Sequence, residues 1–133
     1  MPAQHDLDLE RVICKVADLD EGGARAFTMG TGPWPLRGFV VRLRDQVRAY
    51  VNRCPHASHP LNLRPHDFLT ADGTLILCHS HGALFEKENG YCVAGPCAGR
   101  SLTALPITID SGYVVLSESA RLEDIDPVET AGS

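Results

Sequence analysis

Two short cysteine–histidine pairs constrain the fold of this chain more than any other feature. Cys54 is followed two residues later by His56, and Cys78 is followed three residues later by His81 and then by Gly82. Thiolate and imidazole are soft and borderline ligands, which suit zinc or an iron–sulfur cluster better than magnesium or calcium. The sequence therefore predicts a metal site supplied by two loops. Its expected ligands are Cys54, His56, Cys78 and His81.

Short strands are expected around both pairs. Runs rich in β-branched and apolar residues recur along the chain with turn residues between them, which is typical of an all-β barrel or sandwich. The run ending at Val51 leads into the first pair, and the run ending at Leu77 leads directly into the second. Strand ends would therefore hold both loops in place. The expected strands are Leu9–Val16, Ala24–Thr28, Phe39–Leu43, Val47–Val51, Leu75–Leu77, Ala83–Phe85, Tyr91–Val93, Leu102–Ile109 and Tyr113–Leu116. The third and fourth of these, and the last two, are expected to pair as hairpins.

The size and composition of the chain fit one globular domain. It has 133 residues, of which 44% are hydrophobic and 22% charged, and such values are ordinary for this class. The longest apolar runs are strand-sized, so no membrane span is expected. The first residues are polar and acidic and lack the basic and apolar regions of a secretion signal, which predicts a cytoplasmic protein. Five cysteines fit reduced thiols better than a disulfide framework, because the number is odd.

The charge is unevenly distributed along the chain. The net charge is −5, yet acidic side chains dominate residues 1–21 and 117–133, whereas basic ones outnumber acidic ones in residues 22–116. We therefore expect acidic tails at residues 1–8 and 117–133 on either side of a domain at residues 9–116. Lysine and arginine form no stripe interleaved with aromatic residues, so nucleic acid is not an expected partner.

The two loops resemble those of a Rieske iron–sulfur domain. That family reads Cys-x-His and Cys-x-x-His-Gly, as this chain does at Cys54 and Cys78, and it holds a [2Fe-2S] cluster with two Cys on one iron and two His on the other. The resemblance covers residues 9–116. It implies an all-β, Rieske-like fold of antiparallel sheets with a small cluster-binding subdomain, about residues 52–98, made of the two loops. It also implies one [2Fe-2S] cluster per chain, bound by the four predicted ligands.

The stretch between the two pairs is longer than is common in the family. Residues 64–73 (RPHDFLTADG) are interpreted as an excursion inserted between the loops. Three further histidines lie close to the ligands in sequence. The family's spacing favours His81 over His79 as a ligand, and we expect His59, His66 and His79 to be surface residues or neighbours of the cluster.

Two more cysteines frame a Val-Ala-Gly-Pro segment. In the family, the corresponding segment covers one side of the cluster, so the segment between Cys92 and Cys97 is expected to do the same. A disulfide between these two residues is conceivable from their spacing. We expect thiols instead, because the cytoplasm is reducing.

The loops indicate a subtype of the family. Rieske proteins of quinol-oxidising respiratory complexes carry one more Cys in each loop, and the two form a disulfide, but here the loops read CPHASH and CHSHG. Those proteins also have a Ser and a Tyr that donate hydrogen bonds to sulfur, where this chain has Ala83 and Phe85. Such donors stabilise the reduced cluster and raise its potential. The resemblance is therefore to soluble Rieske-type ferredoxins, with a potential at the low end of the Rieske range, about −150 mV.

The resemblance implies a one-electron carrier rather than an enzyme by itself. Its partners would be a flavoprotein or other reductase and a terminal oxygenase or other acceptor protein, with no membrane involved. An alternative is an electron-transfer subunit of a larger oxidoreductase complex, of the dioxygenase or nitrite-reductase-like kind. The residues alone also leave open a structural zinc module, although Cys-x-His is not the usual zinc-finger spacing.

Overall fold

Antiparallel β-structure accounts for almost all regular elements of the described residues. The computed structural model describes residues 11–19, 23–29, 36–43, 46–55, 60–62, 64–79, 82–96 and 99–117. Their strands are β1 (Val12–Lys15), β2 (Ala24–Met29), β3 (Leu36–Arg42), β4 (Val47–Val51), β5 (Leu75–Leu77), β6 (Leu84–Glu86), β7 (Cys92–Ala94), β8 (Ala104–Leu105), β9 (Ile107–Asp110) and β10 (Tyr113–Leu116). The described residues hold one helical element, the 3-10 helix η3 (Val16–Asp18). The all-β fold class predicted from the sequence is confirmed.

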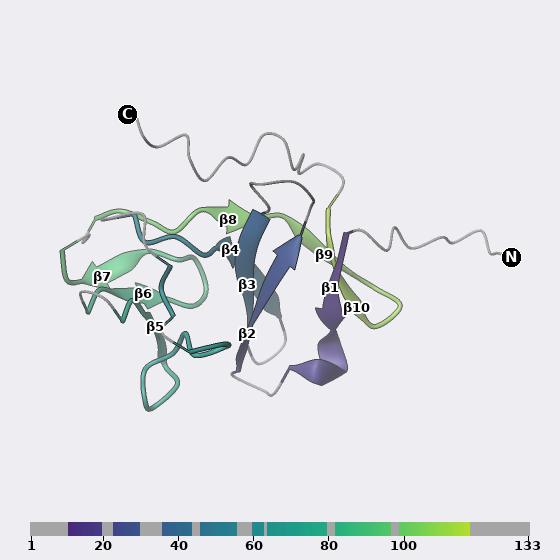
Figure 1. The fold of residues 1–133 in the computed structure, drawn as a ribbon, viewed down its shortest axis with the longest axis horizontal. Coiled ribbons are helices and arrows are strands. Elements are labelled where there is room, and N and C mark those ends of the chain that lie inside the picture. Colours follow the sequence, from purple (N-terminus) through teal and green to yellow (C-terminus); the bar gives the residue numbers. More distant parts are fainter. Residues whose placement is uncertain are drawn as a thin grey trace, which may run out of the picture.

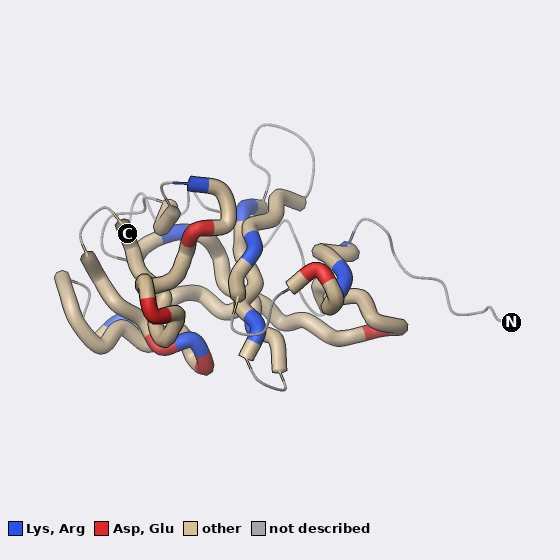
Figure 2. Tube along the Cα trace, turned by 90° about the horizontal axis from the view of Figure 1, so that it is seen from below, with Lys and Arg blue, Asp and Glu red and all other residues tan. Residues whose placement is uncertain are grey.

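The strands form three sheets (Figure 1). The terminal sheet has the order β1-β10-β9, the central sheet has the order β2-β3-β4-β8, and the small sheet has the order β5-β6-β7. The central sheet lies between the other two in Figure 1, with the small sheet on its left. Both predicted hairpins are present, because β3 pairs with β4 and β9 pairs with β10. Basic and acidic positions are interspersed along these elements, with no long block of either sign among the described residues (Figure 2).

Strand β3 borders both hydrophobic cores. Phe39 and Val41 belong to the core that also contains the small sheet, whereas Val40 belongs to the core shared with the terminal sheet. All three side chains are fully buried. A strand covered on both faces needs an almost continuous apolar run, which explains why this stretch reads Phe-Val-Val rather than alternating with polar residues.

One expected strand is divided in the structure. The sequence predicted a single strand over Leu102–Ile109, but the chain forms β8 and β9 on either side of Pro106. The prediction was wrong because proline has no N–H for a sheet ladder and fixes its own φ angle. The break lets the chain pass from the central sheet, where β8 pairs with β4, to the terminal sheet, where β9 pairs with β10.

The excursion is a folded part of the core. Leu69 forms a β-bridge with Ile76, and the Leu77 N–H donates to the Phe68 carbonyl at 2.8 Å. The Phe68 ring is fully buried and stacks on Phe39, with ring centroids 4.3 Å apart and 10° between the ring planes. The segment therefore pairs with the small sheet and packs against the central one.

A hydrogen-bonded turn closes the end of the excursion. The Asp72 carboxylate accepts hydrogen bonds from the Thr70 hydroxyl at 2.6 Å and from the Thr74 amide and hydroxyl at 3.1 and 2.8 Å. These bonds, the Thr70 bond first, lower the pKa of Asp72 to about 2. A carboxyl group whose pKa is lowered by folding stabilises the native state at pH values above its ordinary pKa. That stabilisation is lost as the pH falls toward 2. The Lys87 ammonium also donates to the Gly73 carbonyl at 2.9 Å.

His66 joins the excursion to an edge of the central sheet. Its Nδ1 atom accepts a hydrogen bond from the Ala26 N–H at 3.0 Å, and β2 is an edge strand. An unpaired edge N–H is a liability that proteins commonly cover. His66 has a φ angle of 65°, a left-handed conformation that a non-glycine residue adopts only where the surroundings favour it. The sequence had suggested only a surface or cluster-neighbour role for this residue.

Candidate metal centre

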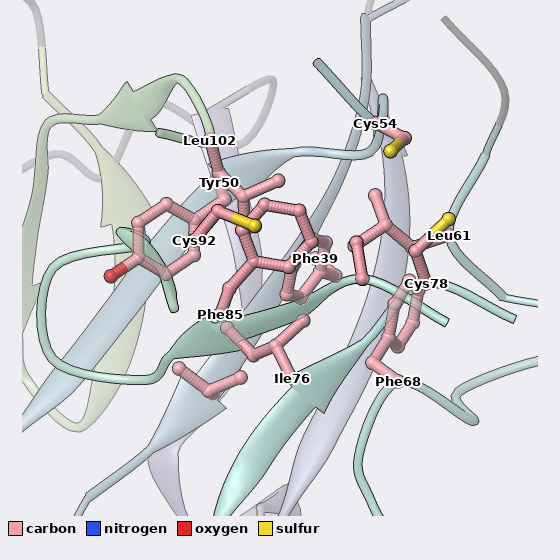
Figure 3. Packing of buried hydrophobic residues seen from close by; sticks show 12 residues of the cluster. Phe39, Tyr50, Cys54, Leu61, Phe68, Ile76, Cys78, Phe85, Cys92 and Leu102 are labelled. Atoms are coloured by element: carbon pink, nitrogen blue, oxygen red, sulfur yellow. The ribbon is translucent and has the colours of Figure 1, made fainter. Parts of the chain in front are cut away.

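Two strands of different sheets deliver the two predicted cysteine ligands. Strand β4 ends at Val51, three residues before Cys54, and β5 ends at Leu77, directly before Cys78. Both cysteines are buried, at 1% and 0% exposure, and both belong to the core between the central and small sheets. In Figure 3 their sulfur atoms lie toward the same end of that core, away from Cys92. The structure thus brings two buried thiols, the sulfur half of the expected donor set, to one region.

The second loop is tightly closed on itself. The Cys78 N–H donates to the Ala83 carbonyl at 2.9 Å, and the Gly82 N–H donates to the Cys78 carbonyl at 2.8 Å. Gly82 has a φ angle of 78°, which glycine adopts without the steric cost that a Cβ atom brings. The Gly after the predicted histidine ligand is therefore explained by the backbone of the loop. A loop of this kind holds the Cys78 backbone with little freedom.

The predicted histidine ligands lie outside the described residues. These two residues are His56 and His81, so the set of four ligands remains a prediction. The described residues include only the two cysteines of this set. Among the described residues, no three Cys, His, Asp or Glu side chains are grouped as they would be around a metal ion. His59 also lies outside the described ranges.

His79 is placed next to the excursion. Its backbone N–H donates to the Leu61 carbonyl at 2.9 Å. Its Nε2 atom is buried and lies 3.6 Å from Asp67 Oδ1, an ion-pair distance that is too long for a hydrogen bond. This side chain thus faces a carboxylate of the excursion. Its expected role as a neighbour of the site rather than a ligand remains a prediction.

The remaining described cysteines differ in their surroundings. Cys92 is buried in β7, and its thiol donates to the Ala94 carbonyl at 3.1 Å. Cys97 lies outside the described residues, so their pairing remains undecided by the structure. Cys14 lies in β1 of the terminal sheet and belongs to the other hydrophobic core. Burial raises the pKa of the Cys14 thiol, Arg25 opposes this, and Asp18 adds to it, so Cys14 is a small, neutral core residue.

The segment after β7 lies directly against the second loop. A Cβ atom placed on Gly95 would come within 2.7 Å of the Ala83 Cα atom, so only a glycine permits this approach. Ala83 and Phe85 are both fully buried and carry no hydroxyl. The close approach supports the expectation that the Gly95-Pro96 segment covers one side of the site.

Two structural features near the predicted site escaped the sequence reasoning. Asn52 and Leu61 form hydrogen bonds that link the two loops, as described below. An Asn between a strand and a ligand is a common turn residue, and only its position two residues before Cys54 could have suggested a role. The buried apolar residues Leu61 and Phe68 were visible as hydrophobic positions in an otherwise polar stretch, which is a signal for packing.

The comparison with protein families identifies the class of this protein. The chain belongs to the family of the Rieske [2Fe-2S] domain, whose model matches residues 10–114. Family membership implies one Rieske-type [2Fe-2S] cluster per chain. The donor chemistry of the described residues fits this group, because two buried thiols at strand ends can hold iron without competition from water.

Within this family, the chain is similar to Rieske-type ferredoxins of known structure. A ferredoxin of Sphingomonas yanoikuyae B1 is 27% identical, with a TM-score of 0.63 over 82% of this chain and 98% of the other. The ferredoxin of carbazole 1,9a-dioxygenase from Nocardioides aromaticivorans IC177 is 24% identical, with a TM-score of 0.63 over 80% of this chain and 94% of the other.

Two further structures share this fold. A complex of reduced oxygenase and oxidised ferredoxin in carbazole 1,9a-dioxygenase contains a chain that is 25% identical, with a TM-score of 0.62 over 80% of this chain and 99% of the other. The terminal oxygenase of carbazole 1,9a-dioxygenase from Novosphingobium sp. KA1 shares the fold, at 19% identity and a TM-score of 0.63 over 79% of this chain, but only over 28% of its own length. No curated protein sequence matches the chain. No helix in the described ranges is both long and apolar enough to span a membrane.

Proposed function

We propose that this protein carries single electrons from a reductase to a terminal oxygenase or a similar acceptor protein. The observation that carries the proposal is the pair of buried cysteines, Cys54 and Cys78, at the ends of strands from two sheets of a Rieske fold. When bound, the [2Fe-2S] cluster supplies a one-electron couple. The two cysteines would hold one iron, and His56 and His81 would hold the other.

The protein itself would hold the ligands rigidly and shield them from water. Cys54 and Cys78 are inaccessible to solvent, and the hydrogen bonds of residues 78–83 restrain the second loop. Rigid ligands change little in position between redox states, which favours rapid electron transfer. The likeness to a ferredoxin found in complex with an oxygenase supports an oxygenase as the acceptor. We also propose a cytoplasmic location, because thiols remain reduced there.

A subunit of a larger oxidoreductase complex is the second candidate. The likeness of the fold to one part of a terminal oxygenase favours it, because that match shows this architecture within a longer chain. In that case the purified protein would not exchange electrons in solution with a free reductase. We also propose that residues 52–98 form the cluster-binding subdomain of a domain spanning residues 9–116, between the two acidic tails.

The ligand assignment is tested by a matched pair of histidine variants. We expect His81→Ala to abolish the EPR signal of the reduced Rieske cluster, because it removes a ligand. His79→Ala is expected to keep the signal, because its ring faces Asp67 and its backbone N–H is unaffected. Loss of the signal in His79→Ala alone would show that the assignment is wrong. A colourless wild-type protein with one bound zinc would contradict the whole proposal in favour of a structural zinc module.

A low reduction potential is the second testable part of the proposal. The double variant Ala83→Ser with Phe85→Tyr adds two hydroxyls that can donate to sulfur and so stabilise the reduced state. A net gain of about 1 kcal/mol per hydrogen bond corresponds to a rise of roughly 40 mV each for a one-electron couple. Redox titration followed by EPR measures this rise. The control Ile109→Thr adds a hydroxyl on exposed β9 in the terminal sheet and should leave the potential unchanged. An unchanged potential in the double variant would mean that residues 83 and 85 do not reach the sulfurs.

A further inference from the structure

The backbone N–H and carbonyl of one residue, Leu61, link the two cysteine loops. The Leu61 N–H donates to Asn52 Oδ1 at 2.8 Å, and the Leu61 carbonyl accepts from the His79 N–H at 2.9 Å. Asn52 lies two residues before Cys54, and His79 directly follows Cys78. The Leu61 side chain is fully buried in the same core as both cysteines, and Figure 3 shows it next to Cys78. Two hydrogen bonds therefore connect loops that come from different sheets.

The Asn52 side chain has a fixed orientation. Its backbone N–H donates to the Arg37 carbonyl of β3 at 2.9 Å, which anchors the residue to the central sheet. Its Nδ2 atom donates to Asn62 Oδ1 at 2.9 Å, and Asn62 Nδ2 donates in turn to the Arg64 carbonyl at 3.0 Å. Because both ends of the Asn52 amide are engaged, its oxygen must face the Leu61 N–H.

Within the described residues, no regular β-pairing joins the two loops. Cys54 follows β4 of the central sheet, and Cys78 follows β5 of the small sheet. The two strands belong to separate hydrogen-bonded ladders, so their ends are not held in register by a shared sheet. A ligand set drawn from two such loops keeps its geometry only if something else sets the distance between them.

We propose that Asn52 is a positioning residue that sets the relative placement of the two cysteine loops through Leu61. The inference rests on the proposed function, since it concerns the geometry of the cluster ligands. Asn52 does not bind iron; it acts through the Leu61 backbone. Loss of its oxygen leaves the Leu61 N–H without an acceptor and frees the first loop to move relative to the second.

Three variants of the holoprotein separate this role from a general effect on folding. Asn52→Leu has a similar shape but neither accepts nor donates a hydrogen bond. Asn52→Asp keeps an oxygen for the Leu61 N–H, and Asn62→Ala removes only the outer link. We expect Asn52→Leu to lose iron to a chelator roughly tenfold faster than wild type and to give a broadened EPR spectrum. Asn52→Asp and Asn62→Ala should lie within about twofold of wild type.

The possible outcomes distinguish failure of the positioning role of Asn52 from failure of the proposed electron-transfer function. A wild-type protein without a Rieske signal contradicts the proposed function itself. A normal wild type with an unchanged Asn52→Leu variant, or with Asn62→Ala as impaired as Asn52→Leu, overturns the positioning role alone. If Asn52→Leu does not fold, Asn52→Gln is used, because it keeps the amide but displaces its oxygen by one methylene. Broadened EPR lines in that variant support the proposal, and lines identical to wild type overturn it.

Discussion

Replacing Phe68 by alanine is expected to destabilise the protein by about 3–5 kcal/mol. The Phe68 ring is fully buried and stacks on Phe39, so its removal leaves a cavity between the excursion and the central sheet. The apolar atoms lost and the unfilled space both contribute to the cost. Urea unfolding of the holoprotein, followed by far-UV circular dichroism, measures the change. Iron release should also accelerate, because Phe68 shares its core with Cys54 and Cys78.

Phe68→Leu is the matched control for this experiment. Leucine keeps most of the apolar volume but removes the ring that stacks on Phe39, and we expect a cost of about 1 kcal/mol. A Phe68→Ala variant no less stable than Phe68→Leu would mean that the excursion is not part of the folded core. The comparison thus separates filling of space from the contact between the rings.

Replacing Gly95 by alanine is expected to have the second large effect, roughly 2–5 kcal/mol of lost stability together with loss of the cluster. Gly95 has a φ angle of 97°, and an added Cβ atom would meet the Ala83 backbone at 2.7 Å. Backbone cannot rotate away as the end of a side chain can, so the second ligand loop must shift. Iron content and the visible spectrum of the purified variant measure this shift, and denaturant unfolding measures the stability.

Gly99→Ala separates the clash from the backbone strain. Gly99 also has a left-handed φ angle, 90°, but an added Cβ atom would meet nothing within 4 Å. This variant should therefore lose only about 1–2 kcal/mol, the cost of a Cβ atom in a left-handed conformation, and keep its cluster. Equal effects in the two variants would show that strain, rather than contact with Ala83, explains the role of Gly95.

Much of the fold follows from local patterns in the sequence. Short β-branched runs bounded by turn residues predicted β4 within the same bounds that the structure has, and β5 likewise. Strand β4 leads to Cys54 and β5 leads to Cys78, so the sequence also predicted that these cysteines follow the ends of strands. The pattern failed at Leu102–Ile109, where apolar residues continue across Pro106. An apolar run reports burial and not sheet membership, so it cannot tell one strand from two that lie in different sheets.

The parts that sequence reasoning missed depend on contacts between distant residues. His66 accepts a hydrogen bond from Ala26, 40 residues away, and nothing local to either residue indicates that partner. Phe68 stacks on Phe39, which lies 29 residues earlier in the chain. The excursion therefore looked like a loop inserted between two ligand pairs, because its polar and turn residues are local signals and its packing is not.

The four predicted ligands stand out in the sequence for a chemical reason. Cysteine and histidine at close spacing are rarely needed for packing, so their pattern reports metal chemistry directly. The hydrogen bonds of Asn52 gave no such signal, because Asn52 and Asn62 are ordinary turn residues whose amides become informative only when their partners are known. Candidate ligands therefore leave a clearer signal in the sequence than a residue such as Asn52, whose hydrogen-bond partners only the structure shows.

The place of β3 between the two cores has a mechanical consequence. Phe39 and Val41 project into the core that contains the cysteines, and Val40 projects into the other, from adjacent positions of one strand. A hinge between two bodies needs a boundary that few contacts cross. Strand β3 does not form such a boundary, because its side chains pack into both cores. We therefore expect the two cores to move together, so that the domain would meet the proposed acceptor protein as one body.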